Sequence, residues 1–229
     1  MPVTKALYEI MNITQVYLTV VDKNDRPRDF ISEYQNQTTY LQLFLEECLR
    51  KHKNDVGAFN RLVFEEGGCS SEDFQVVGNN ALPVSIEYTY EELFSLDSNR
   101  SIHEYFVRKF LEGFKRFDDH FSTSYVDLLE PLIKDKYKDE LYFEKKMATK
   151  KIGNLRLQAI GRFSSNSFDL IIKVFDGRSL IKSKIIYQCE PDMFIVKFHA
   201  YKVDITEELV SIISKVDEKT LELNIADII

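Results

Sequence analysis

The sequence is poor in the residues that build covalent or metal frameworks. It contains no tryptophan, and only three cysteines, five prolines and eight glycines among 229 residues. Cys48, Cys69 and Cys189 are odd in number and lie far apart, so they predict neither a disulfide framework nor a thiol-bound metal, and the reducing cytoplasm is the expected location. The scarcity of glycine and proline excludes a collagen-like or linker-dominated chain.

Long apolar runs are also missing. No stretch of about 18 apolar residues occurs, which excludes a transmembrane helix. Polar residues such as Glu9, Asn12 and Gln15 interrupt the segment Met1–Val21, which therefore does not read as a signal peptide. We expect no association with a membrane.

The common catalytic and cofactor motifs are absent. No HxH, HxxxH or HExxH pair occurs among the four histidines, which are His52, His103, His120 and His199. The GxGxxG and GxxxxGK phosphate loops and the GxSxG nucleophile turn do not occur either. The sequence therefore assigns no catalytic residue, no metal ligand and no cofactor.

One short motif does match a known pattern. Pro191-Asp192 followed by Asp217-Glu218-Lys219 resembles the PD-(D/E)xK arrangement of metal-dependent nucleases. The resemblance implies two carboxylates that hold Mg²⁺ and a lysine that helps to position the attacking water. However, Asp192 falls in a predicted turn and Asp217 precedes its strand, whereas the family has them on adjacent strand ends. An acidic chain also repels nucleic-acid phosphates, so we interpret the motif as a chance match and expect no nucleic-acid partner.

The hydrophobic pattern predicts a mixed α+β fold with an N-terminal region of strands and a helix. Hydrophobic residues make up 44% of the chain, which is enough to bury a core. Strands are expected where β-branched and aromatic residues cluster or alternate, and a helix where apolar residues recur at three- and four-residue steps. The expected elements are an extended segment over Ala6–Val21, a helix over Ser32–Lys53, and strands over Phe59–Phe64 and Val84–Tyr90.

Two helices are expected in the centre of the chain. Ser98 or Ser101 can cap the first helix. A phenylalanine stripe of helical spacing, typical of a core face, runs down its side through Phe106, Phe110, Phe114, Phe117 and Phe121. The second helix is predicted over Tyr125–Met147, with Pro131 near its first turn or kinking it.

The C-terminal region is predicted to be an antiparallel β-meander, because its strands are joined by gaps too short for any other connection. The strand candidates are Leu155–Phe163, Phe168–Phe175, Leu180–Gln188 and Met193–Val203. A short helix over Ile205–Lys215 and a last strand over Thr220–Ile225 are expected to follow. Since no linker-like segment interrupts the chain, we predict a single α+β domain over residues 1–229, with a soft internal boundary near residue 150.

Basic residues are absent from one long window. The chain carries 30 basic and 37 acidic side chains, a formal charge of −7. Between Arg61 and Arg100 no lysine or arginine occurs, although the composition would give about five. We call Leu62–Asn99 the acidic window. Its acids are Glu65, Glu66, Glu72, Asp73, Glu87, Glu91, Glu92 and Asp97, and its aromatic residues are Phe64, Phe74, Tyr88, Tyr90 and Phe94.

The acidic window has two interpretations. As a binding surface it would attract a protein partner with a basic surface, with Tyr88 or Tyr90 as the anchor. The carboxylates that would meet that partner are Glu65, Glu66, Asp73, Glu87, Glu91 and Glu92. As a structural feature it would be a solvated face, or it would pair with the basic run of Lys145, Lys146, Lys150, Lys151, Arg156 and Arg162. On an alternating strand Tyr88 and Tyr90 share a face with Val84 and Ile86, which is more naturally the core face.

These observations favour a cytoplasmic, non-enzymatic protein that binds another protein. In size, acidity and lack of catalytic motifs the chain resembles inhibitors of the immunity type, which neutralise a toxic enzyme by covering its basic active-site surface. The alternative is an enzyme or small-ligand module whose site forms only in three dimensions, between the meander and the phenylalanine-rich helix. A deep pocket lined by His103 or His199 together with carboxylates would favour it.

Overall fold

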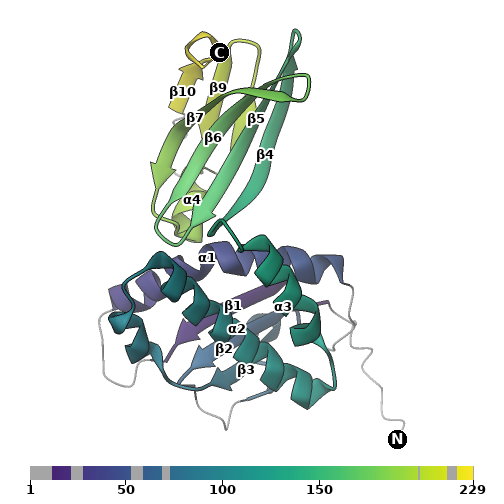
Figure 1. The fold of residues 1–229 in the computed structure, drawn as a ribbon, viewed down its shortest axis with the longest axis vertical. Coiled ribbons are helices and arrows are strands. Elements are labelled where there is room, and N and C mark those ends of the chain that lie inside the picture. The colour runs from purple at the N-terminus through teal and green to yellow at the C-terminus, as the bar shows by residue number, and fades with distance from the viewer. Residues whose placement is uncertain are drawn as a thin grey trace, which may run out of the picture. The chain divides into compact units, whose positions relative to one another are not determined.

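The computed structural model describes residues 12–21, 28–52, 59–68, 73–200, 202–215 and 221–228. The chain divides into two compact units, Met1–Leu141 and Tyr142–Ile229 (Figure 1). That the whole chain forms one domain stays a prediction. Within the described ranges no helix combines the length and the apolar content needed to cross a membrane.

The first unit is built on a three-stranded parallel sheet. Its strands lie side by side in chain order, and they are β1 (Gln15–Val20), β2 (Arg61–Glu66) and β3 (Ala81–Ile86). Burial alternates along β1 and β2, so that Val16 and Leu18 on one strand and Leu62 and Phe64 on the next enter the core. Period-two burial is typical of a sheet with one face fully covered.

Three helices pack in the first unit, and they are α1 (Arg28–Lys51), α2 (Asn99–Phe121) and α3 (Tyr125–Lys136). Helix α1 connects β1 to β2 and packs on β1, as the crossover between parallel strands requires. Helices α2 and α3 cross in front of the sheet in the view of Figure 1. Tyr34 on α1 meets Phe106 on α2 edge-on, with ring centroids 5.3 Å apart, so these two helices share one core.

The outer edge of β3 is closed by hydrogen bonds from a loop and from α2. The Phe74 N–H donates to the carbonyl of Pro83 (3.1 Å), and the Ser85 N–H donates to the Asp73 carboxylate (2.7 Å). Arg116 donates to the carbonyl of Ser85 and to Asp73. Pro83 has no N–H to offer, so the backbone of this edge is occupied.

The second unit consists of two antiparallel sheets. The larger contains, in spatial order, β4 (Tyr142–Ile152), β5 (Leu155–Ser164), β6 (Phe168–Asp176) and β7 (Ser179–Cys189). The smaller contains β8 (Lys202–Ile205), β9 (Leu209–Ile213) and β10 (Leu221–Asn224), with β9 in the middle. Helix α4 (Met193–His199) connects the sheets along the chain, and β8 lies beside β4.

The α+β class, the two central helices and the C-terminal antiparallel sheet are confirmed. Ser98 caps α2 in a reciprocal arrangement with Ser101, whose N–H donates to the Ser98 hydroxyl at 3.1 Å. Four residues of the phenylalanine stripe, Phe106, Phe110, Phe114 and Phe117, are completely buried. Of the predicted extended segment Ala6–Val21, residues 6–11 lie outside the described part of the chain.

Four expected elements are wrong in type or extent. The helix predicted over Tyr125–Met147 ends at Lys136, and its last residues belong to β4, where pairing with β5 prevails over local helical preference. The segment Ile205–Lys215, predicted as a helix, contains β9, in which Val210 and Ile212 are buried in alternation.

The other two differences lie in the segment Met193–Val203 and at the end of β3. The segment Met193–Val203, predicted as one strand, forms α4 and then β8, because Asp192 accepts the Ile195 N–H (3.3 Å) and so begins a helix. Strand β3 ends at Ile86, so Tyr88 and Tyr90 do not lie on it.

We predict that Gly113→Ala destabilises the chain. A Cβ atom on Gly113 of α2 would lie 2.4 Å from ring atoms of Phe64. The overpacking should lower the free energy of unfolding by about 1–3 kcal/mol, which exceeds the gain in helix propensity of about 1 kcal/mol. Lys115→Ala, at an exposed position of the same helix, is the control. A Gly113→Ala urea midpoint at or above that of the parent chain would contradict the close contact.

Candidate functional site

The structure divides the acidic window into interior and exposed carboxylates. Glu66 is completely buried, and the side chain of Asp73 is 6% exposed. Glu65 is half-buried, whereas Glu87, Glu91 and Glu92 are exposed. Glu72 lies outside the described residues. A partner could therefore reach the carboxylates that follow β3, but not that of Glu66.

Glu66, the last residue of β2, lies at the centre of a buried hydrogen-bond cluster. The Tyr34 hydroxyl donates to its Oε2 at 2.7 Å, and the Tyr105 hydroxyl lies 2.8 Å from Oε2 and 2.9 Å from Oε1. The Thr89 N–H donates to Oε1 at 2.6 Å. Burial first, and then the adjacent Glu66 carboxylate, raises the pKa of Tyr34 well above its ordinary value, so this hydroxyl stays protonated as a donor.

A completely buried lysine accompanies this carboxylate. The Nζ of Lys109 on α2 lies 3.8 Å from Glu66 Oε1. It donates to the carbonyl of Glu87 at 2.6 Å and to Glu112 Oε2 at 3.3 Å. Glu66 and Lys109 thus lie at short range, and hydrogen bonds satisfy most of their charged atoms. These are the conditions under which a protein tolerates a buried ion pair.

Helix α2 supplies the cations that pair with the acidic window. Lys109 lies beside Glu66, Arg116 binds Asp73 at 2.8 Å, and Arg108 pairs with Glu92 on the surface. Of the basic run after residue 144, Arg162 binds Glu144 at 2.8 Å within the second unit. Acids of the window therefore form internal ion pairs with cations of α2, and pairing with the other residues of the basic run stays a prediction.

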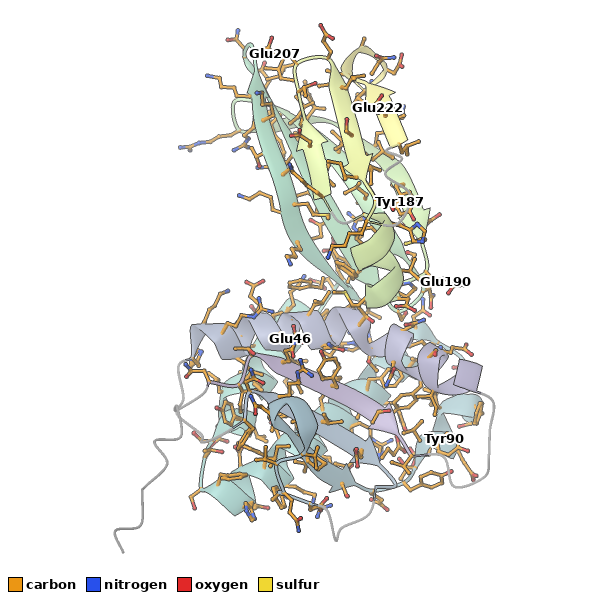
Figure 2. The ribbon with its side chains drawn as sticks, turned by 180° about the vertical axis from the view of Figure 1, so that it is seen from behind. Glu46, Tyr90, Tyr187, Glu190, Glu207 and Glu222 are labelled. Atoms are coloured by element: carbon orange, nitrogen blue, oxygen red, sulfur yellow. The ribbon has the colours of Figure 1, made fainter. Side chains whose placement is uncertain are left out.

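The segment after β3 carries the exposed part of the window. Tyr90, labelled in Figure 2, is 1% exposed and begins the short 3-10 helix η3 (Tyr90–Ser95). Its ring packs edge-on against those of Tyr88 (4.7 Å between centroids) and Phe94 (5.9 Å). Phe94 is 61% exposed. Of the predicted anchors, Tyr90 supports the surface from below, and Phe94 is the aromatic side chain that reaches solvent.

We call Glu87, Glu91, Glu92 and Phe94 the acidic–aromatic surface. Among the residues that the structure describes, Glu87 and Glu91 have no ion-pair partner. A hollow of about 150 Å³ adjoins Phe94 and is lined by Glu33, Tyr34, Gln37, Leu93, Phe94 and Ile102. The sequence did contain a signal for Phe94, since it follows Tyr90 by one helical turn and has acids on either side.

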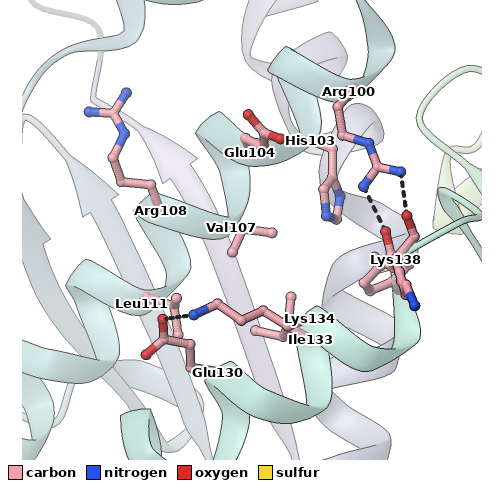
Figure 3. A pocket seen from close by; sticks show the side chains of 11 residues that line it. Arg100, His103, Glu104, Val107, Arg108, Leu111, Glu130, Ile133, Lys134 and Lys138 are labelled. Atoms are coloured by element: carbon pink, nitrogen blue, oxygen red, sulfur yellow. Dashed lines mark hydrogen bonds and ion pairs between the residues drawn. The ribbon is translucent and has the colours of Figure 1, made fainter.

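A larger pocket of about 480 Å³ lies between α2 and α3 (Figure 3). Its floor is apolar, and its polar lining includes His103, Glu104 and Glu130. Glu130 binds Lys134 at 2.7 Å, and Arg100 donates to the carbonyl oxygens of Tyr137 and Lys138. His103 and the two glutamates thus line the same pocket.

The surroundings of His103 make it a structural group. It is 5% exposed, and its Nδ1 lies 2.6 Å from the hydroxyl of Tyr40 on α1. Burial first, and then the Arg100 charge, lowers its pKa to about 4, so the ring is neutral at pH 7 and a weak base. Its recorded hydrogen bond goes to Tyr40 rather than to a carboxylate, so the acid–base pair of the enzyme hypothesis is not formed here.

Of the nuclease-like motif, the structure describes Pro191-Asp192, and this part does not support a nuclease site. Asp192 caps α4, while Asp217 and Lys219 lie outside the described residues. No three His, Cys, Asp or Glu side chains of the described ranges gather closely enough to hold a metal ion.

Comparisons with protein-family models, with curated protein sequences and with solved structures found no match.

We predict that Glu66 and Lys109 are strongly coupled in stability. Lys109→Met leaves the buried Glu66 carboxylate without its lysine, which should cost about 3–5 kcal/mol in the free energy of unfolding. Glu66→Gln should cost less, because Lys109 keeps Glu112 at 3.3 Å. The double variant should cost less than the sum of the two by about 0.5–3 kcal/mol. Urea unfolding of the four chains gives this coupling.

The matched control is the exposed pair of Glu47 and Lys51 on α1, whose charged atoms lie 2.6 Å apart. Its double-mutant cycle should give a coupling below about 1 kcal/mol. Strictly additive effects at Glu66 and Lys109 would contradict the buried pair.

We predict that His103 makes stability depend on pH. In the unfolded chain the imidazole titrates near 6.5, whereas in the folded chain its pKa is about 4. Between these values only the unfolded state binds the proton. The stability contributed by the neutral ring is therefore fully present above about pH 6.5, and it is lost as pH falls toward 4, by up to about 3 kcal/mol. His103→Gln, which keeps a polar group for Tyr40, should flatten the pH dependence of the urea midpoint over this range. An unchanged slope would contradict the buried neutral ring.

Proposed function

We propose that this chain is a non-enzymatic cytoplasmic protein that binds a basic protein partner through the acidic–aromatic surface. One observation carries the proposal: Phe94 is 61% exposed, and three exposed carboxylates, Glu87, Glu91 and Glu92, lie within seven residues of it in the chain. Phenylalanine is one of the aromatic residues that are enriched in protein interfaces relative to the rest of the surface.

The surface is rigid beneath its exposed groups. The ring of Phe94 rests on that of the buried Tyr90, and Lys109 binds the carbonyl of Glu87 from below at 2.6 Å. A partner that binds here therefore orders few groups, which reduces the entropy cost of binding. The neighbouring hollow of about 150 Å³ could accept one apolar side chain of the partner beside Phe94.

Charge selects the partner. Glu87 and Glu91 are not used in the recorded ion pairs of the described residues, so they are available to steer a basic surface and to bind its lysines or arginines. Glu92 already pairs with Arg108, and it contributes less because a partner must compete with that guanidinium.

The specific form of the proposal is an inhibitor of the immunity type. An enzyme that acts on a polyanion needs a basic active-site surface, and a toxic enzyme of this kind fits the acidic–aromatic surface in charge. The chain would neutralise it by covering that surface, without any catalytic group of its own.

A second candidate function rests on the pocket of about 480 Å³ between α2 and α3. Its volume falls in the range of small-molecule sites, about 300–1,000 Å³, and Val107, Leu111 and Ile133 give it an apolar lining. It favours a small-ligand module over an enzyme, because His103 is held by Tyr40.

We predict that Phe94→Ala and the charge reversal Glu87→Lys/Glu91→Lys both weaken binding to the partner. Phe94→Ala should cost about 2 kcal/mol, or more than tenfold in Kd. The charge reversal should mainly slow association, most strongly at low salt. The partner is first captured with the parent chain and purified, and its Kd and association rate are then measured by biolayer interferometry.

The control for charge reversal is Glu207→Lys/Glu222→Lys, at two exposed acids of the second unit (Figure 2). It makes the same change in net charge and should leave association almost unaffected. Equal losses in the two double variants would mean that net charge alone matters, and an unchanged Kd for Phe94→Ala would remove the anchor from the proposal.

A further inference from the structure

The second unit contains a cleft of about 390 Å³ that the proposed function does not use. Its apolar lining comes from β4, β5, α4, β8 and Ala200 before β8. These lining residues are Met147, Phe163, Met193, Val196, Ala200 and Val203. Three lysines complete the lining, and they are Lys145, Lys146 and Lys202. We call this feature the lysine cleft.

A β-bulge shapes one wall of the lysine cleft. Successive side chains of a regular strand point to opposite faces, yet Lys145, Lys146 and Met147 all line the cleft. The register of β4 against β5 shifts between Lys146 and Ala148, which makes Met147 the extra residue. Bulges of this kind turn a side chain away from its regular direction and are frequent beside binding sites.

A glycine on β5 makes room for the methionine. A Cβ atom on Gly161 would lie 3.0 Å from the Met147 sulfur and 2.9 Å from the ring of Phe168. The Met147 side chain therefore lies against the backbone of β5 as part of the apolar lining. Methionine adapts its shape to flexible apolar ligands.

The charge of the lysine cleft is of one sign. Among the described residues that line it there is no aspartate or glutamate. Lys145, Lys146 and Lys202 are exposed, and none of them has an ion-pair partner among the described residues. In contrast, Arg162 and Lys173 nearby both bind Glu144 at 2.8 Å. The three lysines thus keep their positive charge available at the mouth of an apolar cavity.

We infer that the lysine cleft binds a small amphipathic anion, a carboxylate on an unbranched apolar chain. The lysines would bind the carboxylate, and the methionine, phenylalanine and valine side chains would cover the apolar chain. A purely polar anion leaves the apolar lining unused, and a neutral apolar ligand leaves the lysines without a partner. The volume lies at the lower end of the range for small-molecule sites, about 300–1,000 Å³.

The test uses octanoate as the probe and the full-length chain. Isothermal titration should give a Kd of about 1 mM or below, as expected for a ligand of this size. Acetate carries the head group without the chain, and 1-octanol carries the chain without the charge. Both should bind at least about tenfold more weakly than octanoate if head and tail act together.

The variant Lys145→Ala/Lys146→Ala/Lys202→Ala should weaken octanoate binding by about tenfold or more. Lys150→Ala/Lys151→Ala is the matched control, because both lysines are exposed on the same strand but lie outside the cleft. It should change the Kd by less than about twofold. Circular dichroism verifies folding, and Lys146→Glu alone serves if the triple variant does not fold.

Further measurements keep the inference separate from the proposed function. Phe94→Ala, in the first unit, should leave octanoate binding unchanged. The inference is overturned if the folded chain does not bind octanoate, if 1-octanol binds equally well, or if the triple and control variants behave alike. It is also overturned if an acidic peptide or an oligonucleotide competes for the three lysines more tightly than octanoate, since the ligand would then be a polyanion.

Discussion

The first unit depends on the burial of one carboxylate at the end of its central strand. Removing a carboxylate from water costs several kcal/mol unless donors replace the lost hydration. Glu66 receives such donors from Tyr34 on α1, from Tyr105 on α2 and from the backbone of Thr89 after β3. Because these donors come from three separate segments, the carboxylate holds all three in register with β2. An apolar residue at this position would pack against them but would not fix their positions as narrowly, since dispersion contacts have little directional preference.

Because Glu66 is buried, the formal charge of the chain does not describe the charge on its surface. The formal charge of −7 includes carboxylates that belong to the interior or to ion pairs, since Lys109 lies beside Glu66, Arg116 binds Asp73 and Arg108 binds Glu92. A window without basic residues therefore need not be a surface of uniform charge, because cations from a later helix can enter it. The exposed part of the window is a small area that contains Glu87, Glu91, Glu92 and the ring of Phe94.

The sequence predicted those elements whose signals lie close to them in the chain. Helix α2 could be predicted because its cap at Ser98 and its phenylalanine stripe are both within a few residues of the positions they define. The burial of Glu66 was missed because its partners Tyr34 and Tyr105 lie 32 and 39 residues away. Yet a signal existed, since Glu66 continues the alternation of Leu62 and Phe64 along β2.

The lysine cleft could not be predicted, because the bulge at Met147 depends on pairing with β5. Helix α4 was missed because Asp192 was interpreted as a turn residue, although aspartate also caps helices.

The closed edge of β3 affects how copies of this chain meet. An open strand edge invites a strand from another molecule, and repeated pairing of this kind leads to fibrils. Here Asp73 and Arg116 occupy the backbone of Ser85, and the Phe74 N–H occupies the carbonyl of Pro83, which has no N–H. The same side chains that neutralise an acid of the window thus protect the parallel sheet against polymerisation through this edge. The ion pair between Arg116 and Asp73 therefore has a second consequence, because it lowers the tendency of copies of this chain to join strand to strand at β3.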